Sequence, residues 1–246
     1  MSPPVVAAFD FDGTLTDGGS VWRYLAALVG PVPVLRACVA SAPLLAQAAL
    51  VGGTAADRAK EALFTRTLAG LPADEARPRS RAFGLEHYRR HARADVRTRL
   101  ERHRSLGHRI VIVSASPDLY VTAVGELLDA DAVLATHLAV DGDGRLTGRY
   151  DGHNCRGEQK ALRLRAWIDE HPGPGGERPY LWAYGNSAGD RHLLAAADTG
   201  VDVGRLGPLG KLRGFPRLAD VAPTDRADPD PRPGSGSVPG PGSGPG

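Results

Sequence analysis

The chain has 246 residues, of which 42% are hydrophobic, and a formal net charge of +2. This length and hydrophobic fraction suffice for one sizeable core, or for a core with a small accessory domain. Its two cysteines, Cys38 and Cys155, lie far apart outside any C-x-x-C motif, which excludes a disulfide framework and a zinc ribbon and is consistent with a reducing cytoplasm. The N-terminus lacks the basic region and long apolar run of a signal peptide, so we expect a cytoplasmic protein.

Short apolar runs predict buried strands at residues 5–9 (VVAAF), 109–115 (RIVIVSA) and 179–184 (PYLWAY). Each run is too short for a helix, and two are rich in β-branched residues. Residues 199–204 predict a further strand. Residues 132–152 predict a β-hairpin with DGDG at its turn.

Helical patterns at residues 117–130 and 158–171 separate these strands, and residues 20–103 contain several more helices but no good strand. The alternation predicts an α/β fold, a Rossmann-like parallel sheet core with an inserted helical cap domain. We assign residues 1–19 and 104–222 to the core and residues 20–103 to the cap. The Pro-, Gly- and Ser-rich residues 223–246 are predicted to form a disordered tail.

Residues 20–103 form an insert between the first two predicted strands. Its first part, residues 31–51, is apolar and is long enough to span a membrane. It contains Arg36 and Gln47, however, and Pro33 and Pro43 interrupt it. A helical pair packed within the cap is therefore favoured over a span. Shallow contact with a membrane surface remains open, and with it a membrane-associated location.

The second part of the insert, residues 77–109, is dense in arginine. A solvated helix face is the simplest interpretation, and a surface for an anionic substrate, an acidic lipid or a nucleic acid is the alternative. Few aromatic residues, Phe83 and Tyr88, lie between the arginines, which argues against a stacking platform for single strands. We expect no nucleic-acid partner.

Polar residues follow three of the predicted strands, in DFDGTLTD, SASP and GNSAGD. Ligands of open α/β sheets bind beyond the carboxyl ends of the strands, where these segments meet. Asp10 and Asp12 are two residues apart and project to the same side of an extended strand end. Two carboxylates this close repel each other, so either a cation lies between them or one of them is protonated. Gly13 permits a tight turn, and Thr14 offers backbone and hydroxyl donors. The pair fits a magnesium-dependent reaction in which one carboxylate attacks and the other transfers a proton.

At these residues the chain resembles the haloacid dehalogenase superfamily of phosphohydrolases. DFDGTLT resembles the first motif of that superfamily, Ser114 in VSAS the second, Lys160 in GEQKALRL the third and GNSAGD the fourth. The order and spacing match the branch with helical caps, which includes phosphoserine phosphatases and bacterial lipid-phosphate phosphatases. The resemblance covers roughly residues 5–213.

The resemblance implies that Asp10 attacks phosphorus to give an aspartyl-phosphate, while Asp12 protonates the leaving alcohol and then deprotonates water. Ser114 and Lys160 would hold the equatorial phosphate oxygens. We predict that substrate is bound by Thr14, Ser114, Ala115, Arg156 and Lys160, where Arg156 lies just before Lys160 and could contact a phosphate or a lipid headgroup.

The resemblance also implies bound Mg²⁺, which prefers six oxygen ligands. The implied metal residues are Asp10, Asp12, Asn186 and Asp190. Asn186 stands where the family has an acidic ligand, and an amide oxygen is a competent but neutral donor. Either Asn186 binds the cation directly, or Asp190 moves into contact with it.

These features predict a magnesium-dependent phosphomonoester hydrolase acting on a lipid phosphate or a small phosphorylated metabolite. The segment TDGGSVW has Gly18 and Gly19 where serine-phosphate enzymes of this branch have a glutamate, which weakens the expectation of a phosphoserine substrate. The alternative is a catalytically weakened phosphate-binding or interaction protein of the same fold. The sequence does not indicate an oligomeric state.

Overall fold

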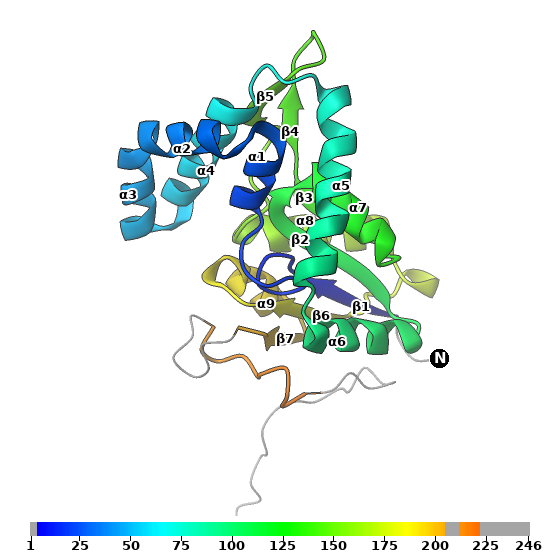
Figure 1. The fold of residues 1–246 in the computed structure, drawn as a ribbon. Helices are drawn as coiled ribbons and strands as arrows, with labels where there is room; N and C mark the ends of the chain where they lie inside the picture. Colours follow the sequence, from blue (N-terminus) through cyan, green and yellow to red (C-terminus); the bar gives the residue numbers. More distant parts are fainter. Residues whose placement is uncertain (1–3, 205–211, 222–246) are drawn as a thin grey trace, which may run out of the picture.

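The computed structural model describes residues 4–204 and 212–221 (Figure 1). The predicted tail, residues 223–246, lies outside the described residues. Within them, five parallel strands form one sheet in the order β3-β2-β1-β6-β7. They are β1 (Val5–Phe9), β2 (Arg109–Pro117), β3 (Ala132–Thr136), β6 (Tyr180–Gly185) and β7 (Thr199–Asp202). The predicted α/β fold with a parallel sheet is confirmed.

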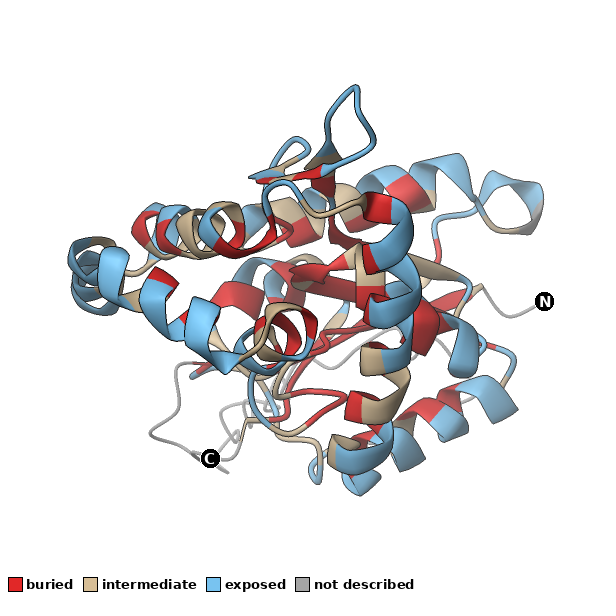
Figure 2. Cartoon of the chain, turned by 45° about the horizontal axis from the view of Figure 1, so that its top comes forward, coloured by how far each residue is buried: buried red, intermediate tan, exposed pale blue. Residues whose placement is uncertain are grey.

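Helices cover both faces of the sheet. Successive residues of β1 point to opposite sides, so its alternate residues pack on different helices. Ala7 and Phe9 pack with α6 (Ala94–Ser105) and α7 (Asp118–Leu127). Val6 and Ala8 pack with α8 (Glu158–Glu170) and α9 (Arg191–Ala196). A 3-10 turn, η1 (Pro174–Gly176), joins α8 to β6. Figure 2 shows the strands and the inner helix faces as the buried part of the molecule.

The insert between β1 and β2 is helical, as predicted. It comprises α6 together with α1 (Val21–Val29), α2 (Pro31–Ala40), α3 (Ala42–Val51), α4 (Gly53–Leu68) and α5 (Ala73–His91). Among the described residues, no single helix is long and apolar enough to cross a membrane. The pair α2 and α3 has the required length and composition only when joined across a 72° bend.

Two helices of the insert lie against the sheet domain. α5 packs on α7, and Gly84 makes their close approach possible, because a Cβ at Gly84 would lie 2.3 Å from the Tyr120 carbonyl oxygen. α6 packs on β2 and places Leu100 in the core beneath the sheet, although the sequence analysis assigned residues 94–103 to the cap. The domain boundaries therefore stay a prediction, and the contacts of α6 favour an earlier end of the cap.

The hairpin predicted over residues 132–152 is correct only in its second part. Residues 132–136 form β3, which pairs with β2 in the parallel sheet. The hairpin consists of β4 (Leu138–Val140) and β5 (Leu146–Tyr150), joined by DGDG as predicted. β5 packs on α4, and Gly148, with φ +72°, lies so close that a Cβ there would be 2.5 Å from the Phe64 carbonyl oxygen.

Candidate active site

Three predicted site residues meet at the carboxyl edge of the sheet. Asp10 directly follows β1, Lys160 lies in the first turn of α8, and Asp190 ends the short helix η2 (Ala188–Asp190) after β6. All three are buried. Lys160 Nζ donates to Asp10 Oδ1 at 2.5 Å and to Asp190 Oδ1 at 2.6 Å, so one ammonium serves two carboxylates.

The shared ammonium leaves the two carboxyl groups with different pKa values. Burial and the Asp190 carboxylate raise the pKa of Asp10 to about 7, although Lys160 acts in the opposite direction. Burial also acts to raise the pKa of Asp190, but Lys160 and Ser187 outweigh it and leave that pKa below its usual value. Burial acts to lower the pKa of Lys160, but the two carboxylates outweigh it and raise that pKa. Lys160 and Asp190 thus form the ionised pair, and Asp10 gains or loses its proton near neutrality.

Asp12 is held in place by partners on two other elements. Its Oδ1 accepts from the Ser20 backbone N–H at 2.8 Å, and its Oδ2 accepts from the Ser116 hydroxyl at 2.5 Å. The Ser20 hydroxyl in turn lies 2.6 Å from the Tyr120 hydroxyl. Because both carboxylate oxygens have donors, the side chain has one defined orientation. Ser20 and Ser116 were not predicted as partners from the sequence.

Asn186 places its amide oxygen among acceptors. Oδ1 lies 3.1 Å from the Asp12 carbonyl oxygen and 3.2 Å from Asp10 Oδ2. Gly13, with φ +82°, permits this approach, because a Cβ there would lie 2.1 Å from the Asn186 amide nitrogen. The Thr14 hydroxyl donates to Oδ1 at 3.3 Å.

Three oxygens this close repel one another unless a cation lies between them or the amide turns by 180° and donates to both acceptors. Ligand distances of about 2.0–2.1 Å in octahedral Mg²⁺ place neighbouring ligand oxygens about 3 Å apart. Asn186 Oδ1 lies close to that distance from both Asp10 Oδ2 and the Asp12 carbonyl oxygen. The donor set therefore fits Mg²⁺. Among the described residues, no three His, Cys, Asp or Glu side chains group as a metal site, so an amide and a main-chain carbonyl are needed here.

Asp190 is engaged on both of its oxygens. Oδ1 accepts from Lys160, whereas Oδ2 accepts from the Ser187 hydroxyl at 2.8 Å and the Ser187 backbone N–H at 3.0 Å. The reciprocal contact of Ser187 and Asp190 is a capping box for η2. This geometry favours Asn186 over Asp190 as the direct ligand of a cation.

The other predicted residues lie around this group. Ser114 is buried within β2, where its hydroxyl accepts from the Ser116 N–H at 3.0 Å. The Ala115 carbonyl accepts from the Thr136 hydroxyl at 2.8 Å. Arg156 Nη1 donates to the Gly53 carbonyl at 3.1 Å, so this side chain connects the segment before α8 to the start of α4. The structure thus links Asp10, Asn186, Lys160 and Asp190 directly, whereas Ser114 and Arg156 bond to other partners.

A family model described as haloacid dehalogenase-like hydrolase matches residues 7–195. The chain belongs to this family. Protein CicA of Caulobacter vibrioides is 36% identical over 198 residues, which cover 79% of this chain and 84% of that protein.

Solved structures share the fold of this hydrolase. A protein of unknown function from Bordetella pertussis Tohama I has a TM-score of 0.69 and 21% identity over 82% of this chain and 91% of that one. A substrate-bound phosphoserine phosphatase complex has a TM-score of 0.61 and 17% identity over 89% of this chain and 95% of that one. The fold is therefore phosphoserine phosphatase-like.

Lys60 lies beside the candidate site, and the sequence did not predict it. It projects from α4, and its Nζ donates to the Ala115 carbonyl at 2.7 Å, next to Ser114. Burial lowers the pKa of Lys60 to about 8, with Asp12 among the charges that oppose the shift. Its ammonium therefore lies within the electrostatic reach of the site. In the helical segment DRAKEALF nothing distinguishes this lysine from a surface residue.

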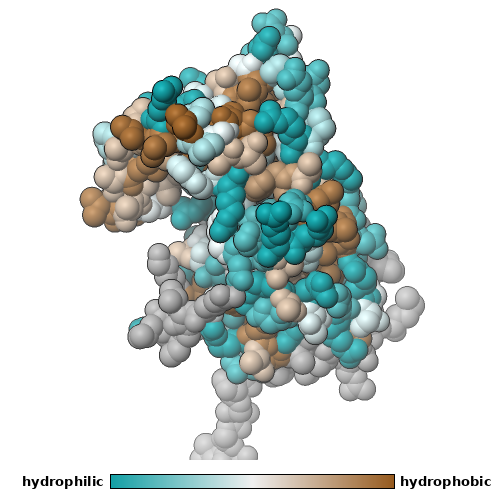
Figure 3. All heavy atoms as spheres, viewed as in Figure 1, coloured by the Kyte–Doolittle hydropathy of each residue, from teal (hydrophilic) through white to brown (hydrophobic). Residues whose placement is uncertain are grey.

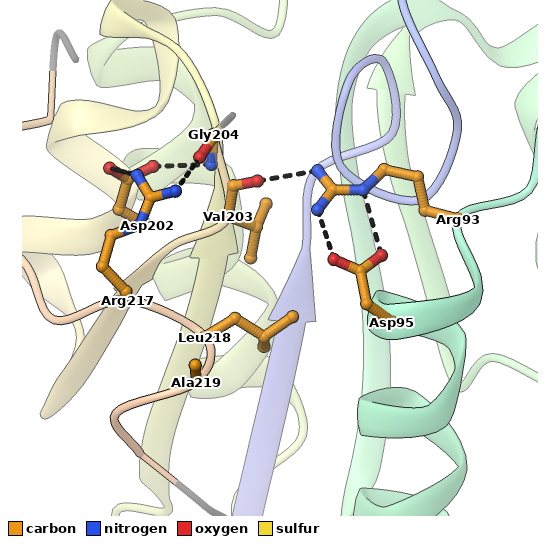
Figure 4. Close-up of a pocket in the computed structure, with 8 residues that line it drawn as sticks. All are labelled: Arg93, Asp95, Asp202, Val203, Gly204, Arg217, Leu218 and Ala219. Atoms are coloured by element: carbon orange, nitrogen blue, oxygen red, sulfur yellow. Dashed lines mark hydrogen bonds and ion pairs between the residues drawn. The ribbon is translucent and has the colours of Figure 1, made fainter. Parts of the chain in front are cut away.

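Arg93 is a second residue that was missed. Its buried guanidinium donates through Nη1 to the Gly13 carbonyl at 2.8 Å and to the Val203 carbonyl at 2.7 Å, and through Nη2 to Asp95 Oδ2 at 2.6 Å. Beside it lies a cavity of about 490 Å³. Figure 4 shows that the charged side chains lining this cavity are paired with one another, Arg93 with Asp95 and Arg217 with Asp202. The cavity flanks the site but presents charges that are already neutralised.

Aromatic packing supports the two strands that carry Asp10 and Asn186. The rings of Phe9 and Tyr184 stack with centroids 4.5 Å apart. The Tyr184 hydroxyl lies 2.6 Å from His103 Nε2, and burial lowers the pKa of His103 to about 3, which keeps its ring neutral. These buried partners on β1, β6 and α6 limit the movement of the residues that follow the two strands.

Proposed function

We propose that the chain is a magnesium-dependent phosphatase that hydrolyses phosphomonoesters through an aspartyl-phosphate on Asp10. The observation that carries the proposal is the arrangement of Asp10, with one oxygen on Lys160 and the other beside the Asn186 amide oxygen, which also lies next to the Asp12 carbonyl. A buried carboxylate in this position is available as a nucleophile, and membership of a hydrolase family supports this assignment.

In the first step, an oxygen of Asp10 attacks phosphorus and the bond from phosphorus to the substrate alcohol breaks. Asp12 supplies the proton that the leaving oxygen takes. In the second step, Asp12 removes a proton from water, the water oxygen attacks phosphorus, and inorganic phosphate leaves with Asp10 restored. The donors Ser20 and Ser116 hold Asp12 in a fixed orientation, as a group that acts twice at one position requires.

The transferred phosphoryl group needs donors for its equatorial oxygens. Lys160 and the Ser114 hydroxyl supply them in this proposal, with Thr14 and the backbone of Ala115 beside them. Asp190 fixes the direction of the Lys160 ammonium. Lys60 and Arg156 add positive charge from the α4 side, which favours a dianionic ester.

Mg²⁺ would be held by Asp10 Oδ2, the Asp12 carbonyl oxygen and Asn186 Oδ1. When bound, it would neutralise charge on the phosphate oxygens. Asn186 contributes no charge, so the protein supplies less negative charge than a site with a carboxylate at this position. We therefore expect moderate metal affinity that a carboxylate at position 186 would increase.

The substrate class is a phosphomonoester, either a lipid phosphate or a small phosphorylated metabolite. The test is phosphate release from a panel of esters with and without acyl chains, each assayed with Mg²⁺ and with EDTA. We expect Mg²⁺-dependent release that Asp10→Asn abolishes. Faster release from acylated esters would identify a lipid phosphate, and equal rates would exclude that preference.

The neutral residue at position 186 also supports a second candidate, a phosphate-binding protein with little catalysis. Calorimetric titration with Mg²⁺ and with inorganic phosphate separates the two functions. Phosphate binding without Mg²⁺ binding, together with no release from any ester, would favour the second candidate and contradict the first.

A further inference from the structure

The outer face of α2 is apolar. Val32, Leu35 and Val39 are 57%, 59% and 70% exposed, and their spacing places them along one face of the helix. Val34 and Ala37 cover the opposite, inner face, where they are buried. A helix with apolar residues on two opposite faces is normally enclosed by protein or by lipid. α2 is enclosed on one side only.

The neighbouring helices extend this surface. α3 has no buried residue, and at its end Leu50 and Val51 are 87% and 73% exposed. α1, which packs against α2, exposes Trp22. Figure 3 shows the hydrophobic side chains gathered at the upper left of the molecule, where α2 and α3 lie in Figure 1. We call Trp22, Val32, Leu35, Val39, Leu50 and Val51 the outer apolar surface.

The chain segment that carries the outer apolar surface has charged residues of one sign. Residues 18–56 contain no Asp or Glu, and their charged residues are Arg23 and Arg36. Both arginines are exposed. Elsewhere the chain mixes the signs, with 30 Lys and Arg against 28 Asp and Glu in total. An apolar surface with cationic neighbours is complementary to the headgroups and acyl boundary of an anionic bilayer.

We propose that the outer apolar surface docks on an anionic phospholipid bilayer, with α2 and α3 lying in the interface. A protein partner fits less well, because protein interfaces of ordinary size carry about ten hydrogen bonds, and Arg36 and Gln47 are the polar side chains that α2 and α3 offer. The 72° bend between the helices suits shallow insertion rather than a span. Trp22 has the amphipathic side chain favoured at such interfaces. This inference goes beyond hydrolysis and places the enzyme at a membrane.

The test is flotation of the full chain with vesicles of phosphatidylcholine, with and without phosphatidylglycerol. We expect binding to the anionic vesicles that weakens as salt is raised. The double variant Leu35→Glu with Leu50→Glu should reduce the bound fraction about tenfold or more, because two apolar anchors become anions. The matched control is Leu127→Glu on α7, where the leucine is 53% exposed and lies outside the surface. This control should bind like the wild type.

Three results would overturn the inference: absence of binding to both kinds of vesicle, equal binding by the double variant and the wild type, or a concentration-dependent dimer that the double variant abolishes. The last result would make the surface a contact between copies of the chain. Asp10→Asn should bind vesicles like the wild type, so loss of hydrolysis and loss of docking are distinguishable. Release of phosphate from a water-soluble ester by the double variant checks that it is folded.

Discussion

Arg93 donates a hydrogen bond of 2.8 Å to the carbonyl oxygen of Gly13, which lies 80 residues earlier in the chain. Gly13 belongs to the turn that follows Asp12, and Arg93 directly precedes α6, the last helix of the insert. The same nitrogen also binds the Val203 carbonyl beyond β7. One side chain therefore connects the catalytic turn, the end of the insert and the last strand of the sheet.

Replacing Arg93 should loosen the catalytic turn. Arg93→Ala leaves the carbonyls of Gly13 and Val203 without their donor, which should lower the free energy of unfolding by about 2–4 kcal/mol and lower kcat. Arg93→Lys should recover part of both. The measurements are urea unfolding and phosphate release. Arg97→Ala, four residues on and 56% exposed, is the control and should change stability by less than about 0.5 kcal/mol. Equal effects at both positions would contradict the role of Arg93.

Asn186→Asp should tighten Mg²⁺ binding by about tenfold, because a carboxylate replaces a neutral amide beside the Asp12 carbonyl and Asp10. The metal-free variant should be less stable than the metal-free wild type, since a third carboxylate joins Asp10 and Asp190. Calorimetric titration and thermal melts in EDTA measure these two changes. Asn186→Ala should weaken binding. Unchanged affinity in both variants would show that Asn186 is not a ligand.

Asp10 should make the metal-free protein less stable as the pH rises. Its pKa is raised to about 7, whereas an unfolded aspartate titrates near ~3.9. Between these values the folded chain binds more protons than the unfolded chain, so the free energy of unfolding falls with rising pH. Asp10→Asn removes this titration. In EDTA, the Tm of the variant minus that of the wild type should therefore increase from about pH 5 to about pH 8. A constant difference would contradict the raised pKa.

Lys60 should set an alkaline limit on activity. Its pKa is lowered to about 8, so its ammonium is present below that pH and lost above it. We expect kcat/KM of the wild type to fall above about pH 8, and Lys60→Arg to extend the plateau upward. Lys60→Met should lower kcat/KM about tenfold at neutral pH and remove this limit. Arg58→Met on the exposed side of the same helix is the control. A profile that is unchanged in Lys60→Met would exclude Lys60 from the site.

Much of the fold could be predicted from the sequence because its signals are local. Apolar runs of strand length, helical periodicity between them and polar residues after each run predicted the parallel sheet and the edge at which Asp10 and Asn186 meet. β3 was assigned to the hairpin because AVLAT runs into the next strand with no Gly or Pro between them to mark a break. The pairing of β3 with β2 depends on residues about twenty positions apart in the sequence. Local periodicity does not predict such a contact.

The partners of the site residues were less predictable. Lys60 reaches Ala115 across 55 residues, and Ser116 reaches Asp12 across 104. Such contacts depend on how the inserted helices pack on the sheet. A lysine or serine that will be enclosed has the same local sequence as one that will face water. The nucleophile candidate was predictable because paired acids after a buried strand are unusual in themselves.

The contact of β5 with α4 bears on how substrate enters. The inserted helices touch the rest of the chain at several separate places, through α5 on α7, α6 on β2 and α4 on β5. At the last of these, Gly148 lies close to Phe64, and the Tyr150 N–H donates to Glu61 Oε1 at 3.0 Å. A displacement of α4 alone would break this contact. If α4 moves to admit substrate, we therefore expect the β4–β5 hairpin to move with it as one piece.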